Sequence, residues 1–532
     1  MKAEILMGDE AVALGAIHAG IKKACGYPGT PSTEIFEYIL DQVNKNNAPI
    51  HAQWAANEKV AYEEAMGASF AGCRSIVTMK HVGLNVAADP LMNSSITGVN
   101  GGVVVVVADD PSMHSSQNEQ DSRYYANFAQ ILCLEPSNQQ ECYDMTREAY
   151  ELSEKYCVPV ILRMVTRLAH SRCKVELKEA VEQKKLNVST DSKQWVLLPA
   201  NARIRYKKLL AVQPALQEYS ESCAYNKLVL RGKKLGVITT GVAFDYLQDY
   251  MQQAETDFSY LKINTYPVPL KKIQELCDYV DEVIIIEEGM PFLEEKLRGI
   301  LKNNYNIHGK LDGRLSRDGE LTPESIRTAL QVAQLEHAAL PTMQLPPRPP
   351  ALCTGCPHVD LYTALNAARK DYPNAQIFGD IGCYTLGALP PFNAIMTTLD
   401  MGASISMAKG AANCGIFPAL AVIGDSTFSH SGITSLLGAI RENTNMTVII
   451  LDNATVAMTG GQKTMTTCEM LDKLVLGLGV EPEHFKVIFP LPKNLEENTN
   501  IIKKEIEYNG LSVIISRREC LQTAKKHAKK GV

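Results

Sequence analysis

The sequence has no apolar run of about 18 residues, which is the length a helix needs to cross a bilayer. Its first residues, MKAEILMGDEAVALG, lack the succession of basic, apolar and small residues that marks a signal peptide. It also lacks a basic excess, because the formal net charge is -6 and the pI is about 6.1, whereas phosphate binding needs a basic surface. These absences predict a cytoplasmic protein that binds neither a membrane nor nucleic acid.

No disulfide framework is apparent, although the chain has 14 cysteines among 532 residues. Most of them stand alone, which is typical of small buried hydrophobic side chains in a reducing compartment. The isolated ones include Cys25, Cys73, Cys133, Cys142, Cys157, Cys173, Cys223 and Cys277. A single CxxC pair, Cys353 with Cys356, stands out from this background.

Short apolar runs alternate with helical patterns in three stretches of the chain. SIVTMK, VVVVVA and VPVILRMV lie in the first, KLGVITTG and EVIIIEE in the second, and ALAVIGDS, TVIILDN and LSVIIS in the third. Such runs are typical of buried strands in parallel sheets covered by helices. We therefore predict an α/β protein with three doubly wound, Rossmann-like domains. Their ranges are 1–180, 231–335 and 353–532, with a helical connector at 181–230 and a Pro-rich linker at 336–352.

Gly424, Asp425 and Ser426 follow the strand ALAVI and open a helix. A helix N-terminus suits a phosphate, and Asp425 can ligate Mg²⁺, which prefers hard oxygens. Asn453 ends the next strand and can supply a second oxygen, and the carbonyl of Thr455 can supply a third. This pattern predicts a thiamine diphosphate site. The alternative is an ordinary strand-to-helix turn with an aspartate N-cap.

Glu58, in WAANEKVAYEEAMGASFAG, is the candidate carboxylate for the aminopyrimidine ring of thiamine. A glutamate held in an apolar pocket can move the proton that lets the cofactor form its ylide. It precedes a helix in which Ala61, Ala65 and Gly67 keep one face small, so that another surface can approach. The alternative is a helix N-terminal acid stabilised by the helix dipole.

In YPGTPSTEIFEYIL, we predict Thr30 as the N-cap of a helix and Pro31 as its first residue. Such a helix N-terminus can bind a substrate carboxylate or serve capping alone. Lys80, His81 and Arg123 lie in polar loops after strands, where α/β proteins place ligands, and could face the reacting centre. A lone histidine is more often a satisfied structural group.

Four cysteines bracket the diphosphate motif: Cys353, Cys356, Cys383 and Cys520. The first two form a bidentate turn, and the other two follow strands, where an iron–sulfur cluster could be held. Zinc suits four thiolates equally well by charge and geometry, and a CxxC alone can be a redox dithiol. Cys414 and Cys468 compete for the fourth place.

Several segments together resemble the large subunit of indolepyruvate ferredoxin oxidoreductase, a family of the 2-oxoacid:ferredoxin oxidoreductases. They are NEKVA, TMKHVGLNVAADPLM, MHSSQNEQD, TGCPH, GDIGCYTLGALPP, MGASI, GDSTFSHSGIT and LDN with AMTGGQ. The resemblance covers nearly the whole chain. It implies a pyrimidine-binding domain first, a transketolase C-terminal-like domain next and a diphosphate-binding domain last.

The same resemblance implies roles for individual residues. Glu58 would form the ylide. Asp425, Asn453 and the Thr455 carbonyl would hold Mg²⁺. The four bracketing cysteines would hold one [4Fe-4S] cluster.

The implied reaction is the oxidative decarboxylation of an arylpyruvate to an arylacetyl-CoA, with coenzyme A as cosubstrate. Its electrons would pass one at a time to ferredoxin or another carrier. A separate small (beta) subunit would complete a heterotetramer.

Two features depart from the family pattern. The chain shows no C-x2-C-x2-C-x3-C-P module after Cys520, which places the onward electron carriers elsewhere, and Gly461 stands where relatives often have histidine. Two other functions stay open at this stage. One is a non-oxidative thiamine-dependent decarboxylase with structural cysteines, and the other is a zinc-stabilised, catalytically silent subunit. The Lys-rich segment TAKKHAKKGV is most simply a solvated helical tail.

Overall fold

The structure, a computed structural model, describes residues 2–188, 192–301, 305–316, 319–334, 351–398 and 400–530. It divides into two compact units, Met1–Leu340 and Pro341–Val532. Largely parallel sheets alternate with helices in both units, which confirms the predicted α/β class. Most of the predicted linker at 336–352 lies outside the described residues.

The first sheet of unit 1 has seven strands in the order β12-β6-β7-β5-β4-β2-β3. They are β2 (Lys23–Gly26), β3 (His51–Trp54), β4 (Ser75–Lys80), β5 (Val103–Asp109), β6 (Cys133–Leu134), β7 (Val160–Val165) and β12 (Thr265–Tyr266). Neighbouring strands are parallel except that β12 runs antiparallel to β6. Along β5, Val104 and Val106 belong to one hydrophobic cluster and Val105 and Val107 to another, so the valine run is buried on both faces.

Helices connect successive strands of this region. They are α1 (Gly8–His18), α2 (Thr33–Asn46), α3 (Glu58–Phe70), α4 (His81–Val86), α5 (Ala88–Thr97), α6 (Arg123–Ala129), α7 (Gln139–Tyr156) and α8 (Thr166–His170). A small antiparallel pair, β1 (Ala3–Met7) with β8 (Arg172–Glu176), joins the beginning and end of this region.

The second sheet of unit 1 has five strands in the order β14-β13-β10-β11-β9, of which β9 is antiparallel to β11. The strands are β9 (Lys227–Val229), β10 (Leu235–Thr240), β11 (Ser259–Ile263), β13 (Glu282–Ile286) and β14 (Ile307–His308). Their helices are α11 (Val242–Gln253), α12 (Leu270–Tyr279), α13 (Phe292–Ile300) and α14 (Pro323–Ala329). Because β12 follows β11 yet pairs with β6, this part of the chain contributes a strand to the first sheet.

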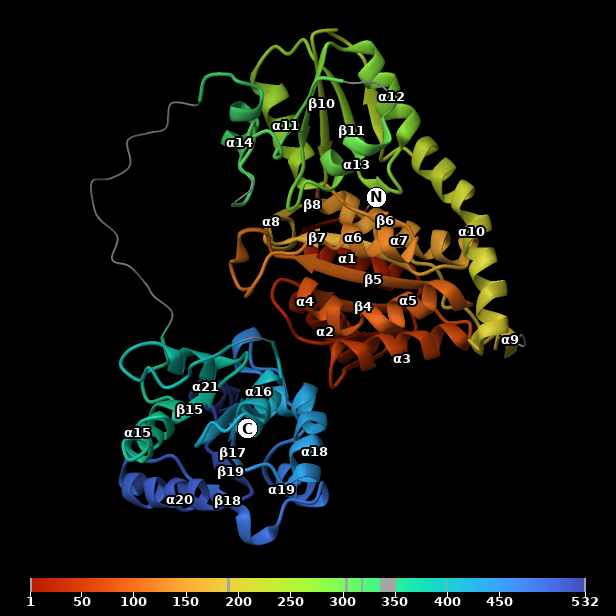
Figure 1. Cartoon of the computed structure of the whole chain (residues 1–532). Coiled ribbons are helices and arrows are strands. Elements are labelled where there is room, and N and C mark those ends of the chain that lie inside the picture. Colours follow the sequence, from red (N-terminus) through yellow and green to blue (C-terminus); the bar gives the residue numbers. More distant parts are fainter. Residues whose placement is uncertain are drawn as a thin grey trace. The chain divides into compact units, whose positions relative to one another are not determined.

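The helical connector is observed as α9 (Ser192–Trp195) and α10 (Pro199–Ser222). Figure 1 shows α10 running along one side of unit 1, where it contacts α5 of the first sheet and α12 of the second. No helix within the described ranges is both long and apolar enough to span a membrane.

Unit 2 contains one fully parallel sheet in the order β15-β16-β17-β19-β18. Its strands are β15 (Gln376–Phe378), β16 (Ala419–Gly424), β17 (Met446–Asp452), β18 (Phe485–Ile488) and β19 (Leu511–Arg517). Its helices are α15 (Pro357–Arg369), α16 (Ala403–Asn413), α17 (Asp425–Thr427), α18 (Ile433–Glu442), α19 (Cys468–Gly477), α20 (Leu495–Glu507) and α21 (Leu521–Lys530). The parallel arrangement brings the carboxyl ends of β16, β17 and β19 to one edge, where polar side chains gather.

Candidate active site

Asp425 lies directly after β16 and is only 2% exposed. The Ser426 N–H donates to its Oδ1 (2.6 Å), and the Ala454 N–H donates to its Oδ2 (2.9 Å). Within the described residues no basic side chain forms an ion pair with this carboxylate. Burial therefore raises the pKa of Asp425 to about 7, and the nearby charge of Asp452 adds to the rise.

The loop after β17 folds back onto Asp425, because β16 and β17 are paired up to Gly424 and Leu451. Asn453 is 9% exposed, and its Oδ1 accepts a hydrogen bond from the Thr455 N–H (3.1 Å). A carboxylate and an amide oxygen thus lie on adjacent loops, and the carboxylate has no cation of its own. This donor set fits Mg²⁺, which binds through hard oxygens and the phosphates of its ligand.

The aromatic ring of Tyr384 packs against Gly424 and leaves no room there for a Cβ. A Cβ at this position would lie 2.8 Å from Cε1 of Tyr384. The hydroxyl of Tyr384 in turn donates to Asp380, a fully buried carboxylate that also accepts from the Ser404 N–H (3.2 Å). Burial raises the pKa of Asp380 to about 7.

Asp380 is a buried carboxylate beside the candidate site that the sequence interpretation did not single out. The signal was available, since Gly-Asp follows the strand QIF at 379–380 just as it follows ALAVI at 424–425. Thr427 connects the two segments, because its hydroxyl donates to the carbonyl of Ile381 (3.0 Å).

The structure brings the four predicted cluster cysteines together in unit 2. Burial raises the pKa of the Cys383 thiol to about 12, and the charges of the other three cysteines of the set act in the same direction. Burial likewise raises the pKa of Cys356, with smaller contributions from Cys353 and Cys520.

The Cys353 to Cys356 turn packs against the chain that follows Cys520. The Cys356 N–H donates to the Cys353 carbonyl (2.9 Å), which closes the turn. Gly355 has a φ of +78° and approaches Leu521 of α21 so closely that a Cβ would lie 3.1 Å from its Cδ1. The Gln522 side chain donates to the Cys353 sulfur (3.8 Å).

One hydrogen bond joins the predicted magnesium-binding loop to the predicted cluster cysteines. The Cys520 N–H donates to the backbone carbonyl of Asn453 (3.1 Å). The pairing of β17 with β19, in register at Asp452 and Arg517, makes this bond possible. The predicted magnesium ligand and the predicted cluster ligand are therefore in direct backbone contact.

The competing cysteines lie elsewhere on unit 2. Cys468 is exposed, and its N–H is bound by Asp452 Oδ2 (2.9 Å) at the start of α19. Cys414 is exposed at the end of α16. Cys520 is among the largest causes of the raised pKa of both Cys356 and Cys383, and neither Cys414 nor Cys468 is among them.

Glu58, in unit 1, is the first residue of α3 rather than a residue before the helix, and Asn57 caps it. The glutamate is 5% exposed, and its side chain packs against Gly83 of α4. A Cβ on Gly83 would lie 2.5 Å from Glu58 Oε1, so only glycine leaves room for the carboxylate here. Burial lowers the pKa of Lys80, while the charges of Asp110 and Glu58 oppose that shift.

The predicted capping role of Thr30 is wrong. Helix α2 begins at Thr33, and Ser32 occupies the N-cap position. The Ser32 hydroxyl donates to the Gly29 carbonyl (2.8 Å) and the Gly29 N–H donates to the Thr33 hydroxyl (2.9 Å), so a separate turn precedes the helix. The Thr30 carbonyl accepts from Ser115 (3.3 Å).

His81 and Arg123 have different surroundings in unit 1. His81 is 1% exposed, and its Nε2 lies 3.1 Å from the Asn118 carbonyl oxygen. Arg123 does not face an open site, because its guanidinium is fully buried between Asp121 and Glu287. Asp121 belongs to the first sheet region and Glu287 follows β13 of the second, so Arg123 joins the two regions.

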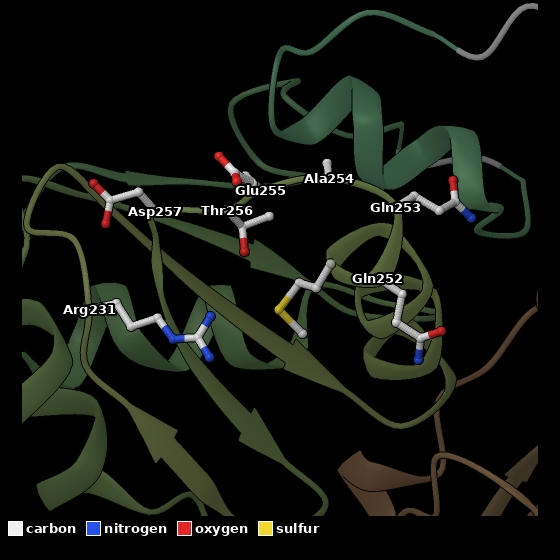
Figure 2. Close-up of a pocket in the computed structure, with 8 residues that line it drawn as sticks. Arg231, Gln252, Gln253, Ala254, Glu255, Thr256 and Asp257 are labelled. Atoms are coloured by element: carbon white, nitrogen blue, oxygen red, sulfur yellow. The ribbon is translucent and has the colours of Figure 1, made fainter.

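A surface pocket of unit 1 holds none of the predicted site residues. It lies beside the end of α11, and its lining includes Arg231, Gln252, Thr256 and Asp257 (Figure 2).

Two family profiles match the chain. One, described as "Pyruvate flavodoxin/ferredoxin oxidoreductase, thiamine diP-bdg", matches residues 14–217. The other, "Thiamine pyrophosphate enzyme, C-terminal TPP binding domain", matches residues 380–480 and so contains Asp425 and Asn453.

Indolepyruvate oxidoreductase subunit IorA of Archaeoglobus fulgidus is 36% identical over 97% of this chain and 86% of that protein. The chain belongs to the IorA family. The IorA subunit of Methanothermobacter marburgensis is 37% identical with the same coverage. Among solved structures, 2-oxoglutarate:ferredoxin oxidoreductase from Magnetococcus marinus shares the fold, with a TM-score of 0.52 at 19% identity over 62% of this chain and 65% of that chain.

Membership of the IorA family confirms the expected enzyme class. The chain is a 2-oxoacid:ferredoxin oxidoreductase subunit that works with thiamine diphosphate in the oxidative decarboxylation of a 2-oxoacid.

Proposed function

We propose that this IorA-family chain converts an arylpyruvate of the indolepyruvate type to an arylacetyl-CoA. Its electrons would leave through a [4Fe-4S] cluster to ferredoxin or another carrier protein. The names of the relatives call them subunits of an indolepyruvate oxidoreductase, which supports an aromatic substrate and a partner subunit in a heterotetramer. Coenzyme A as cosubstrate follows from the acyl product.

Thiamine diphosphate, when bound, supplies the carbanion that allows a 2-oxoacid to lose CO₂. In our proposal residues 353–532 bind its diphosphate, with Gly424 and Ser426 at the helix N-terminus and Asp425, Asn453 and the Thr455 carbonyl on Mg²⁺. The Mg²⁺ ion would neutralise the charge of the Asp425 carboxylate. Bound Mg²⁺ would hold this carboxylate ionised in spite of its burial.

Residues 1–180 would bind the pyrimidine end, where Glu58 holds and returns a proton. Its burial against Gly83 keeps the carboxylate away from water, which suits a proton carrier. We assign Thr30 and His81 to substrate handling near this end, since both lie at the carboxyl edge of the first sheet. Residues 231–335 would form the transketolase C-terminal-like domain.

Cys353, Cys356, Cys383 and Cys520 would hold the cluster. A single zinc ion binds sulfur at about 2.3 Å in a tetrahedron, which would bring its four ligands to about 3.8 Å from one another. A [4Fe-4S] cluster instead takes one thiolate on each of its four iron atoms, and membership of an oxidoreductase family favours this redox centre over zinc. Burial raises the pKa values of Cys356 and Cys383, so cluster binding at these two thiols releases protons.

The observation that carries this proposal is the 3.1 Å bond from the Cys520 N–H to the Asn453 carbonyl, because it connects the cofactor loop to the redox centre. The test is an anaerobic dye-reduction assay of the enzyme with indolepyruvate, phenylpyruvate, hydroxyphenylpyruvate and 2-oxoglutarate, with and without coenzyme A. We expect coenzyme A-dependent reduction with the aryl substrates. Aldehyde release without dye reduction would instead identify a non-oxidative decarboxylase.

Glu58→Gln tests the catalytic assignment, because the amide cannot carry the proton. We expect kcat to fall by about 10²–10⁴-fold, the usual contribution of general acid–base catalysis. Glu63→Gln, an exposed change on the same helix, is the matched control and should keep full activity. Unchanged turnover in Glu58→Gln would contradict the role of Glu58.

A further inference from the structure

Three side chains with metal-binding atoms meet in unit 1, at positions that the proposed cofactor site does not use. Asp9 is in the first turn of α1, Glu34 in the first turn of α2, and His170 at the end of α8. One ligand atom from each lies within 4.8 Å of the other two. The His170 Nε2 is 3.8 Å from Glu34 Oε2.

Asp9 is the unusual member of this group. It is 0% exposed, and neither of its carboxylate oxygens has a hydrogen-bond partner within the described part of the chain. Burial raises the pKa of Asp9 far above its usual value, and the charges of Glu34 and Glu10 raise it further. A buried carboxylate without donors is costly unless a proton or a cation accompanies it.

Within the described part of the chain, no basic side chain forms an ion pair with Asp9. Arg172 pairs with Glu10 instead, at 3.6 Å from its Oε2, and the Arg172 side chain is 54% exposed. Glu10 also accepts a hydrogen bond at its Oε2 from the Met7 N–H (2.8 Å). His170 interacts with Glu34, so the imidazole does not neutralise Asp9.

We propose that Asp9, Glu34 and His170 form a binding site for a divalent transition-metal ion. Two carboxylates and one imidazole are ligands that suit Mn²⁺, Fe²⁺ and Zn²⁺, whereas Mg²⁺ prefers oxygen ligands alone. The side chains of His170 and Glu34 are 38% and 36% exposed, which leaves an approach for the metal and for water to complete its coordination.

The bound metal would act as a clamp on three helices. Glu34 is the second residue of α2, whose first residue, Thr33, accepts a hydrogen bond from Gly29 in the preceding turn. An ion on Glu34 would therefore fix the first turn of α2 against α1 and α8. The site is separate from the proposed magnesium site, whose ligands are in unit 2.

Manganese binding by the full chain tests this site. The protein, prepared with its native cluster and without thiamine diphosphate, is titrated with Mn²⁺ while the free-ion EPR signal is followed. We expect tight binding of Mn²⁺ in the wild type and in Asp425→Asn, with electron spin echo modulation from one imidazole nitrogen. Thermal melting should shift upward with Mn²⁺ in both proteins.

His170→Gln should abolish the nitrogen modulation and the Mn²⁺-dependent melting shift, and Asp9→Asn should weaken binding by at least about 100-fold. Both variants should melt like the wild type when no metal is present, which separates lost binding from misfolding. Nitrogen modulation that persists in His170→Gln would overturn the proposal. So would a wild-type chain that binds no Mn²⁺ at millimolar concentration, because Asp9 would then simply be protonated.

Discussion

Two buried aspartates of this chain have opposite electrostatic surroundings. Asp121 in unit 1 is 4% exposed and Asp425 in unit 2 is 2% exposed. Burial would raise the pKa of both, but the charges of Arg123 and Arg163 hold the pKa of Asp121 at about 2. Within the described residues no arginine or lysine forms an ion pair with Asp425, and burial raises the pKa of Asp425 to about 7.

This contrast separates a structural charge from a functional one. Asp121 is paired with two buried guanidinium groups inside the protein, so its role is complete once the chain has folded. Asp425 keeps an unneutralised charge at a strand end, as a site that receives a cation with its ligand does. The predictions below test this distinction.

The largest effect on stability is expected for Arg123→Met. The change leaves Glu287 buried without its cation and Asp121 with Arg163 alone, and removal of one partner from a buried pair costs about 3–5 kcal/mol. Arg167→Met is the control, since Arg167 is 44% exposed beside Glu320 and an exposed pair contributes about 0–1 kcal/mol. Chemical denaturation of the full chain measures both, and equal losses would remove the distinction between the two kinds of charge.

Asp425→Asn is expected to act on binding and not on folding. The amide removes an uncompensated buried charge, so the metal-free protein should be at least as stable as the wild type. Affinity for thiamine diphosphate with Mg²⁺ should fall by at least about 100-fold, as loss of a metal ligand implies. Calorimetric titration measures the affinity, with Asp371→Asn, an exposed partner of Lys503, as the control. Wild-type affinity in Asp425→Asn would show that the carboxylate is not a ligand.

Gly83→Ala should displace Glu58 without changing its charge. The added Cβ would lie 2.5 Å from Glu58 Oε1, whereas Gly67 on α3 has no atom within 4 Å of the same position. We expect turnover to fall about 10-fold for Gly83→Ala, in line with the cost of overpacking, and to be unchanged for Gly67→Ala. Steady-state kinetics with a saturating 2-oxoacid distinguishes the two. Equal rates would mean that the position of Glu58 does not limit the reaction.

The last expected effect is a pH dependence of the unfolding free energy of the metal-free protein. The folded pKa of Asp425, about 7, exceeds the unfolded value of about 3.9, so the folded state binds the extra proton between these two values. Stability from this group is therefore present at low pH and is lost as the pH rises through about 7. Unfolding free energies from about pH 5 to about pH 8 should fall less steeply in Asp425→Asn. An identical slope of unfolding free energy against pH in both proteins would mean that Asp425 is not the group that titrates in this range.

The strand-end residues of unit 2 could be identified from sequence because parallel strands place their carboxyl ends at one edge. Asp425, Asn453 and Cys520 each follow an apolar run, and the structure brings all three together. The bond between Asn453 and Cys520 could not be predicted. It depends on the register of β17 against β19, which no local pattern reveals.

The sequence interpretation failed where a residue's partner is distant or its turn has competing hydrogen bonds. Arg123 has the features of a loop residue, but its partner Glu287 lies 164 positions away. Thr30 before proline matches a capping pattern, yet the bonds of Ser32 and Thr33 to Gly29 move the helix start. The first contact joins residues that are distant in the sequence, and the second depends on which of several nearby hydroxyl groups bonds within the turn.

Freeze-quench EPR of the anaerobic enzyme after mixing with indolepyruvate tests the central claim, which is that a sulfur-ligated iron centre lies beside the thiamine site of unit 2. The wild type and Cys414→Ser, a change at an exposed cysteine, should contain iron and sulfide and show a substrate-reduced cluster signal. Cys383→Ser should lose the iron, the signal and ferredoxin reduction. An iron-free wild type, or a Cys383→Ser variant that still reduces ferredoxin, would contradict the account.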